Sequence, residues 1–136
     1  MDPITIEASI NASKEKVWQC WTESEHIREW CAASDDWHAP KAENDVREGG
    51  KFVTRMEAKD GSAGFDFSGV YTRVMPPDIL EYTLDDGRKV SVVFSDTEAG
   101  TNVKETFEPE ASNDLEFQRA GWQSILDNFK QYVEKK

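Results

Sequence analysis

The side chain best suited to chemistry in this 136-residue sequence is Glu105. It lies between Val103 and Phe107 in an alternating segment, and the alternation directs its carboxyl to the same side as these two apolar residues. Burial disfavours a charged carboxyl and raises its pKa, which suits the group to proton transfer or to anchoring a polar part of a ligand. A local bulge or a solvated position near a sheet edge would instead leave Glu105 in water, and the sequence leaves these alternatives open.

Three further side chains could take part in chemistry or polar recognition. His38, beside Trp37, would titrate near neutral pH and could act as a general base, although a single histidine flanking a loop is commonly only a surface residue. Tyr71 and Tyr82 could donate phenolic hydrogen bonds either to a ligand or to backbone carbonyls. Glu105 and His38 are thus the catalytic candidates, and neither belongs to a recognisable catalytic motif.

Several classes of function find no support in the sequence. The two cysteines and two histidines lack metal-ligand spacing, so we expect reduced thiols, no metal site and no cofactor. There is no nucleophile elbow, phosphate-binding loop, dinucleotide fingerprint or zinc-protease motif. The net charge of -11 repels phosphate backbones and anionic lipids, so we expect neither nucleic acid nor membrane as a partner. Without a long apolar run or a signal-like N-terminus, the protein is expected to be cytoplasmic.

The elements that must position these side chains can be predicted from periodicity. Residues 4–10 alternate as in a half-buried strand, Ser13 is a favourable N-cap for a short helix, and Thr22 with Glu25 is typical of a capping box at the start of a second helix. The pattern then changes to a period of two interrupted by turn signals. It predicts strands at residues 37–44, 51–58, 64–74, 79–84, 88–95 and 101–108, with a kink at Gly69. The connections are short, so neighbouring strands should be antiparallel.

A long final helix is predicted from about Asp114 to Glu134, with Asn113 as its N-cap. Its apolar residues form a single stripe, which needs one broad apolar surface as its partner. A 20-residue helix spans about 30 Å and can cross a whole sheet. The predicted fold class is therefore α+β, with a curved antiparallel sheet of about seven strands, two short helices after the first strand and a long C-terminal helix.

Four groups of residues give this β-α-α-β-β-β-β-β-β-α order a family resemblance. They are residues 13–22 with Trp30, residues 49–52, residues 67–71 with 75–77, and residues 121–122 with 125–129. The chain resembles the helix-grip fold of the START-like superfamily, also called SRPBCC or Bet v 1-like. Within that superfamily it is similar to the AHSA1-like group, named after the activator of the Hsp90 ATPase. The resemblance covers nearly the whole chain, and residues 1–136 are expected to form a single AHSA1-like domain.

The resemblance implies a cavity between the last helix and the concave face of the sheet, used across the superfamily to hold apolar molecules. Alternation places Thr54, Phe65 and Val90 on that face, and the region of Trp30 and Trp37 often forms the cavity opening in this fold. The predicted ligand-binding residues are Trp30, Trp37, Phe52, Met56, Phe67, Tyr71, Tyr82, Val92, Phe94, Val103, Glu105, Trp122, Leu126 and Phe129. For each apolar member, the alternative is ordinary packing in the core.

Three functions follow as hypotheses. The first is binding of a small hydrophobic or amphipathic molecule in the cavity. The second is a cyclase-, lyase- or hydrolase-type enzyme that uses the same cavity, with Glu105 or His38 moving protons. The third is a protein-interaction role resembling that of an Hsp90 co-chaperone; the resemblance implies less here, because in the two-domain co-chaperones the main ATPase-stimulating contacts lie in a separate N-terminal domain that this sequence does not resemble. The sequence leaves open whether the chain forms a homodimer.

Overall fold

The computed structural model describes residues 2–111 and 114–136. The chain begins with β1 (Ile4–Ile10), α1 (Lys14–Thr22) and α2 (Ser24–Trp30). Six strands follow, and the chain ends with a long helix: β2 (Trp37–Asn44), β3 (Lys51–Ala58), β4 (Gly64–Met75), β5 (Ile79–Leu84), β6 (Lys89–Thr97), β7 (Gly100–Phe107) and α3 (Leu115–Lys135). The predicted element order is confirmed. No helix in the described ranges is both long enough and apolar enough to cross a membrane.

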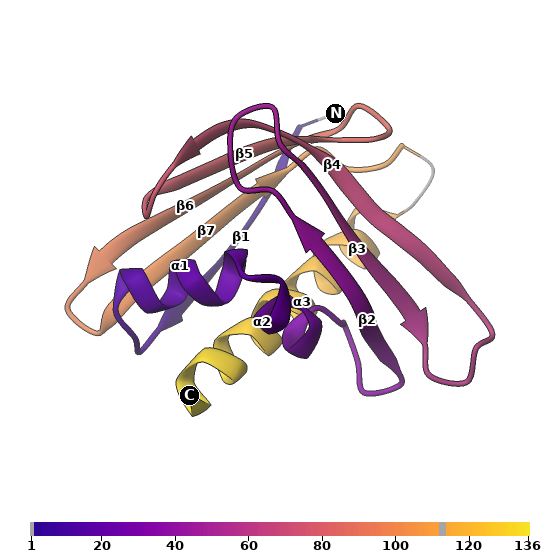
Figure 1. Ribbon diagram of the computed structural model, residues 1–136, viewed down its shortest axis with the longest axis horizontal. Coiled ribbons are helices and arrows are strands. Elements are labelled where there is room, and N and C mark those ends of the chain that lie inside the picture. Colours follow the sequence, from indigo (N-terminus) through magenta and orange to yellow (C-terminus); the bar gives the residue numbers. More distant parts are fainter. Residues whose placement is uncertain (1, 112–113) are drawn as a thin grey trace.

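The strands form one antiparallel sheet in the order β1-β7-β6-β5-β4-β3-β2. The chain starts at one edge of this sheet, and α1 and α2 then carry it to β2 at the other edge. Figure 1 shows the sheet bending over α3, with β2, β3 and β4 on one side of the bend and β6, β7 and β1 on the other. The predicted helix-grip architecture is therefore correct, and α3 lies beneath the concave face.

The caps of the first two helices differ from the prediction at one point. Ser13 caps α1 as expected, since its hydroxyl accepts a hydrogen bond from the backbone N–H of Lys16 at 3.3 Å. The predicted capping box at Thr22 is wrong, because Thr22 is the last residue of α1 and its hydroxyl donates to the Trp18 carbonyl at 2.8 Å. Glu23 takes the N-cap position of α2 without a side-chain hydrogen bond.

The N-terminus of α3 is capped by Asp114, whose carboxylate accepts a hydrogen bond from the backbone N–H of Phe117 at 3.2 Å. The predicted N-cap, Asn113, lies outside the described residues. The negative charge of this cap also interacts favourably with the positive end of the helix dipole. The cap anchors the N-terminal half of α3, which forms part of the candidate site.

Gly69 has a different role from the one predicted. The irregular pairing between β4 and β5 lies between Tyr71 and Arg73, not at Gly69. A Cβ atom on Gly69 would lie 2.4 Å from the Thr83 carbonyl oxygen and 3.1 Å from Cε1 of Phe52. Only glycine therefore allows β5 and the Phe52 ring to approach this closely.

One end of the space between α3 and the sheet is filled completely. We call it the packed end, and its residues come from β1, α1, β6, β7 and the C-terminal half of α3. Each is at most 2% exposed: Ile10, Val17, Phe94, Val103, Phe129 and Val133. The ring of Phe129 meets those of Trp21 and Trp30 edge-on, with centroids 4.9 and 4.8 Å away. Burial and edge-on ring contacts together make this end a densely packed core.

Candidate functional site

The other end of the same space is a cavity of about 270 Å³. We call it the cavity end. A water molecule occupies about 30 Å³ in the liquid, so the cavity has room for a small organic molecule. Most of the lining residues are apolar or aromatic, as in many small-molecule sites. They are Trp21, Ile27, Trp30, Cys31, Asn44, Phe52, Thr54, Met56, Phe65, Phe67, Tyr71, Tyr82, Arg88, Glu105, Glu110, Gln118, Trp122, Ile125 and Leu126.

The cavity is open because α3 does not lie flat against the middle of the sheet. Its nearest backbone neighbours are β1, α2 and α1. The remaining gap to the sheet is bridged by Trp122, whose ring stacks on Phe107 with centroids 4.0 Å apart and planes 7° apart. The same indole meets Phe67 edge-on at 5.9 Å. Trp122 therefore closes the cavity on the helix side without filling it.

Nine of the predicted ligand-binding residues lie on the cavity wall. They come from α2, from four strands and from α3, and they are Trp30, Phe52, Met56, Phe67, Tyr71, Tyr82, Glu105, Trp122 and Leu126. Strand alternation and the apolar stripe of the last helix therefore identified much of the wall. Their role in ligand binding stays a prediction.

Four predicted wall residues belong to the core instead and do not reach the cavity: Val92, Phe94, Val103 and Phe129. Their side chains do face inward, as alternation indicated. Phe94 is covered by Trp18 and Trp21, at centroid distances of 5.5 and 5.8 Å, and Phe129 is enclosed by the helical tryptophans. The correction has a simple reason: alternation shows which face a residue occupies, whereas the insertion of α1 and α2 determines which part of that face is covered.

Trp37 and His38 also lie away from the cavity wall. Trp37 is half-buried and its ring lies 6.0 Å from that of Phe65, which does line the cavity. His38 is exposed on β2, where it pairs with Glu57 of β3. His38 is therefore not one of the residues that line the cavity, and of the two catalytic candidates Glu105 lies on the wall.

Glu105 is buried on the cavity wall, with 5% of its surface exposed. The predicted inward orientation is confirmed and the bulge alternative is wrong, since Glu105 pairs regularly with Val92 on one side and Ile6 on the other. Burial raises the pKa of Glu105 from its ordinary value of 4.5 to about 8. In the described part of the chain its carboxyl makes no hydrogen bond or ion pair. Glu105 therefore carries a proton at neutral pH and can donate it in a hydrogen bond or in a reaction.

The two tyrosines on the wall are held differently. The Tyr71 hydroxyl donates to the side-chain oxygen of Asn44 at 2.6 Å, and the Asn44 amide donates in turn to the Thr22 carbonyl at 2.7 Å. Burial raises the pKa of Tyr71 to about 12. Tyr82 is only 6% exposed, and its hydroxyl has no hydrogen bond with any described residue. Tyr71 is therefore a fixed part of the wall, whereas the Tyr82 hydroxyl is available.

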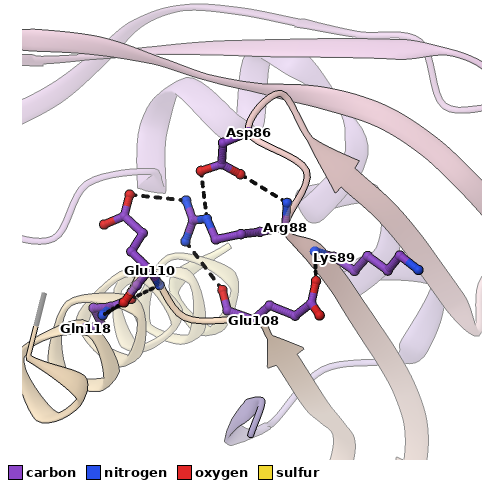
Figure 2. Close-up of polar contacts among 6 residues, drawn as sticks. All are labelled: Asp86, Arg88, Lys89, Glu108, Glu110 and Gln118. Carbon is purple, nitrogen blue, oxygen red and sulfur yellow. Dashed lines mark hydrogen bonds and ion pairs between the residues drawn. The ribbon is translucent and has the colours of Figure 1, made fainter. Parts of the chain in front are cut away.

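Charged and polar residues line one side of the cavity. Figure 2 shows them between the β5–β6 turn and the start of α3. The Arg88 guanidinium lies 2.8 Å from the Asp86 carboxylate and 3.5 Å from that of Glu110. The side-chain oxygen of Gln118 accepts from the Glu110 backbone N–H at 2.7 Å, and its amide nitrogen donates to the Glu110 carbonyl at 2.9 Å. We call Arg88, Glu110 and Gln118 the polar rim. The polar rim connects the β5–β6 turn to α3, and within it the Arg88 charge is already paired.

Thr54 and Phe65, which alternation placed on the concave face, do line the cavity. Sequence reasoning missed other lining residues, for different reasons. Ile27 of α2 and Cys31, directly after α2, lie on the same apolar face as Trp30. The polar rim had no such signal, because its members lie in a turn, in a connection and in the first part of a helix. The signal for Asn44 and for the whole polar rim exists only in the tertiary structure.

A group of possible metal ligands lies elsewhere on the surface. Oxygen and nitrogen atoms of Glu23, Glu25 and His26 lie within 4.8 Å of one another at α2. His26 also contacts the Tyr132 hydroxyl through Nδ1 at 2.5 Å. Exposed acidic groups often lie this close without an ion, and these residues do not line the cavity.

Solved structures with the same fold cover almost the whole chain. An AHSA1-like protein from Aeromonas hydrophila is 50% identical, with a TM-score of 0.93 over 98% of this chain and 92% of that one. A protein from Cytophaga hutchinsonii is 52% identical, with a TM-score of 0.84 over 97% and 92%. A protein from Nitrosomonas europaea shares the fold at 18% identity, with a TM-score of 0.85 over 98% and 95%. No curated protein matches the sequence.

The family model agrees with the fold and with these neighbours. It extends from the end of β1 to the last turn of α3 and so includes every element that lines the cavity. Residues 11–134 match the model described as "Activator of Hsp90 ATPase homolog 1-like protein", and the chain belongs to this family.

Proposed function

We propose that the protein binds a small hydrophobic or amphipathic molecule in the cavity between α3 and the sheet. The observation that carries the proposal is an apolar volume of about 270 Å³ bounded on one wall by the carboxyl of Glu105, which has no hydrogen-bond partner among the described residues. A molecule that fills the volume would remove water from aromatic surfaces, each Å² of which contributes about 25 cal/mol. The carboxyl would orient one polar group of the guest.

The experiment is a titration with N-phenyl-1-naphthylamine, an uncharged dye that fluoresces strongly in apolar surroundings. We expect saturable enhancement with the wild-type protein. Thr54→Phe should abolish the enhancement, because Thr54 is 5% exposed and its side chain lines the cavity. Val53→Phe is the matched control, since Val53 precedes Thr54 on β3 and does not line the cavity, and it should bind the dye as the wild type does.

Two outcomes would contradict the proposal. One is a folded wild-type protein that gives no saturable enhancement. The other is equal enhancement in the two phenylalanine variants, which would place the dye outside the cavity. Native mass spectrometry of freshly purified protein complements the titration, because a co-purified molecule would report its own mass.

Glu105 also supports a second candidate function, an enzyme that moves a proton in the cavity. With its pKa raised to about 8, Glu105 holds a proton at neutral pH and is suited to act as a general acid toward a bound molecule. The candidate requires that Glu105→Gln removes turnover of any substrate found while leaving its binding nearly unchanged. Equal turnover in the variant and the wild type would reject this assignment.

A further inference from the structure

Two polar groups on the cavity wall have hydrogen-bonding capacity that the described part of the chain does not use. These are the carboxyl of Glu105 and the hydroxyl of Tyr82, on residues that are 5% and 6% exposed. No polar side-chain atom of the described residues is both sealed from solvent and without a partner. The oxygen atoms of Glu105 and Tyr82 must therefore reach the open volume of the cavity, where only water or a guest can satisfy them.

The sheet register places these two groups near each other. Glu105 of β7 is opposite Val92 of β6, and Tyr82 of β5 is opposite Val90, two residues earlier on β6. Both side chains point to the concave face. They lie on the two strands that neighbour β6, at positions two residues apart along it. Charge on Glu105 also raises the pKa of Tyr82, in addition to the larger effect of burial. One guest in the cavity can therefore contact both groups.

The cavity contains no unpaired positive charge among the described residues. Cys31, after α2, and Tyr82, on β5, interact electrostatically with Glu105, and neither is cationic. The four residues that α3 contributes to the wall carry no charge. Among the described residues of the wall, Arg88 is the only basic one, and it is already paired with Asp86 and Glu110. With the overall charge of -11, this environment disfavours an anionic head group.

The protonated carboxyl and the phenol are both O–H donors, whereas an amphiphile with a carboxylate would bring a negative charge into a cavity that offers it no unpaired cation among the described residues and that already has the Glu110 carboxylate on its wall. We propose, building on the proposed function, that the cavity selects uncharged apolar molecules that carry a hydrogen-bond-accepting oxygen, such as a ketone or ester carbonyl. This oxygen is held by the Glu105 carboxyl and the Tyr82 hydroxyl. Molecules with a carboxylate are rejected.

The test is displacement of N-phenyl-1-naphthylamine by three competitors of one shape at pH 7. 2-Acetylnaphthalene presents a ketone carbonyl, 2-ethylnaphthalene has no hydrogen-bond acceptor, and 2-naphthoate presents a carboxylate. We expect the ketone to bind about tenfold more tightly than the hydrocarbon, as one or two buried hydrogen bonds would give. The carboxylate should bind at least about tenfold more weakly than the ketone.

Two variants and a change of pH identify the groups responsible. Tyr82→Phe and Glu105→Leu should each bring the ketone close to the hydrocarbon in affinity. Unchanged hydrocarbon affinity in these variants confirms that the cavity is intact. Raising the pH from 7 to 9 ionises Glu105 and should weaken ketone binding by up to about tenfold in the wild type. Glu105→Gln should remove this pH dependence, because its amide donates at either pH.

The outcomes separate this inference from the proposed function. Equal affinity for ketone and hydrocarbon, or carboxylate binding as tight as ketone binding, overturns the inference while leaving an apolar binding site in place. A ketone preference that survives in both Tyr82→Phe and Glu105→Leu also overturns it. Failure of the dye and of all three competitors to bind the wild type contradicts the proposed function itself.

Discussion

The packed end and the cavity end are built from the same sheet and the same helix, yet one is filled and the other is open. At the packed end, residues such as Phe94 and Phe129 are buried against tryptophans of α1 and α2. At the cavity end, Trp122 bridges from α3 to Phe107 of β7 and Phe67 of β4, and open volume remains beside it. Figure 1 shows α1 and α2 beside the C-terminal part of α3.

The comparison shows that the inserted helices determine where the cavity lies. A curved sheet and one straight helix leave a wedge of space, which side chains of a third element can fill. Here the third element is the α1–α2 pair. Trp21 and Trp30 lie at the boundary, since both contact Phe129 and both line the cavity. Stability and binding should therefore respond to different residues.

The largest expected effect separates the two ends directly. Phe129→Ala should lower the free energy of unfolding by about 3–5 kcal/mol, because Phe129 is fully buried among rings. Phe67→Ala is the matched change at the cavity end, and it should cost only about 1–2 kcal/mol because Phe67 is half-buried and already borders open volume. Urea unfolding of both variants measures the difference. Equal losses would mean that the two ends are packed alike.

The next effect concerns Glu105 and the pH. A carboxyl with a raised pKa binds its proton more tightly in the folded state, so the wild type should lose stability as the pH rises from about 4.5 to about 8. Glu105→Gln lacks this titration. The free energy of unfolding of Glu105→Gln minus that of the wild type should therefore increase by roughly 2–3 kcal/mol between pH 5 and pH 7. Chemical unfolding at the two pH values tests this, and a constant difference would show that Glu105 is solvated.

A smaller effect distinguishes the two tyrosines of the cavity wall. Tyr71→Phe should cost about 1–2 kcal/mol, because it removes the 2.6 Å hydrogen bond to Asn44 and leaves that oxygen without its donor. Tyr82→Phe should leave stability nearly unchanged, since the Tyr82 hydroxyl has no partner in the described part of the chain. Thermal unfolding of the pair measures this contrast. A comparable loss in Tyr82→Phe would reveal a structural role for its hydroxyl.

The smallest expected effect lies at the polar rim. Arg88→Gln removes ion pairs to Asp86 and Glu110 and should cost about 0.5–1 kcal/mol at low salt, with less difference at high salt. Arg47→Gln is the control, because the Arg47 side chain is 69% exposed and its pair with Asp45 should contribute almost nothing. A loss above about 2 kcal/mol in Arg88→Gln would make the rim a main support of the cavity end.

The order of elements, the inward face of each strand and the apolar stripe of α3 followed from the sequence alone. These features depend on local periodicity: a period of two places Glu105 beside Val103 and Phe107 on one face, and a period near 3.6 places Trp122, Leu126 and Phe129 on one stripe. Backbone geometry within one strand or helix sets the direction of each side chain, whatever the distant contacts are. That is why the inward orientation of Glu105 could be predicted.

Only the tertiary structure determined which inward residues border open volume. Phe94 and Tyr82 follow the same alternation, yet Phe94 is covered by α1 and Tyr82 faces the cavity. The polar rim likewise forms when the turn before β6, the connection after β7 and α3 meet in space. Periodicity describes direction within one element, whereas a cavity depends on the distance between elements, and that distance is determined by side chains far apart in the sequence.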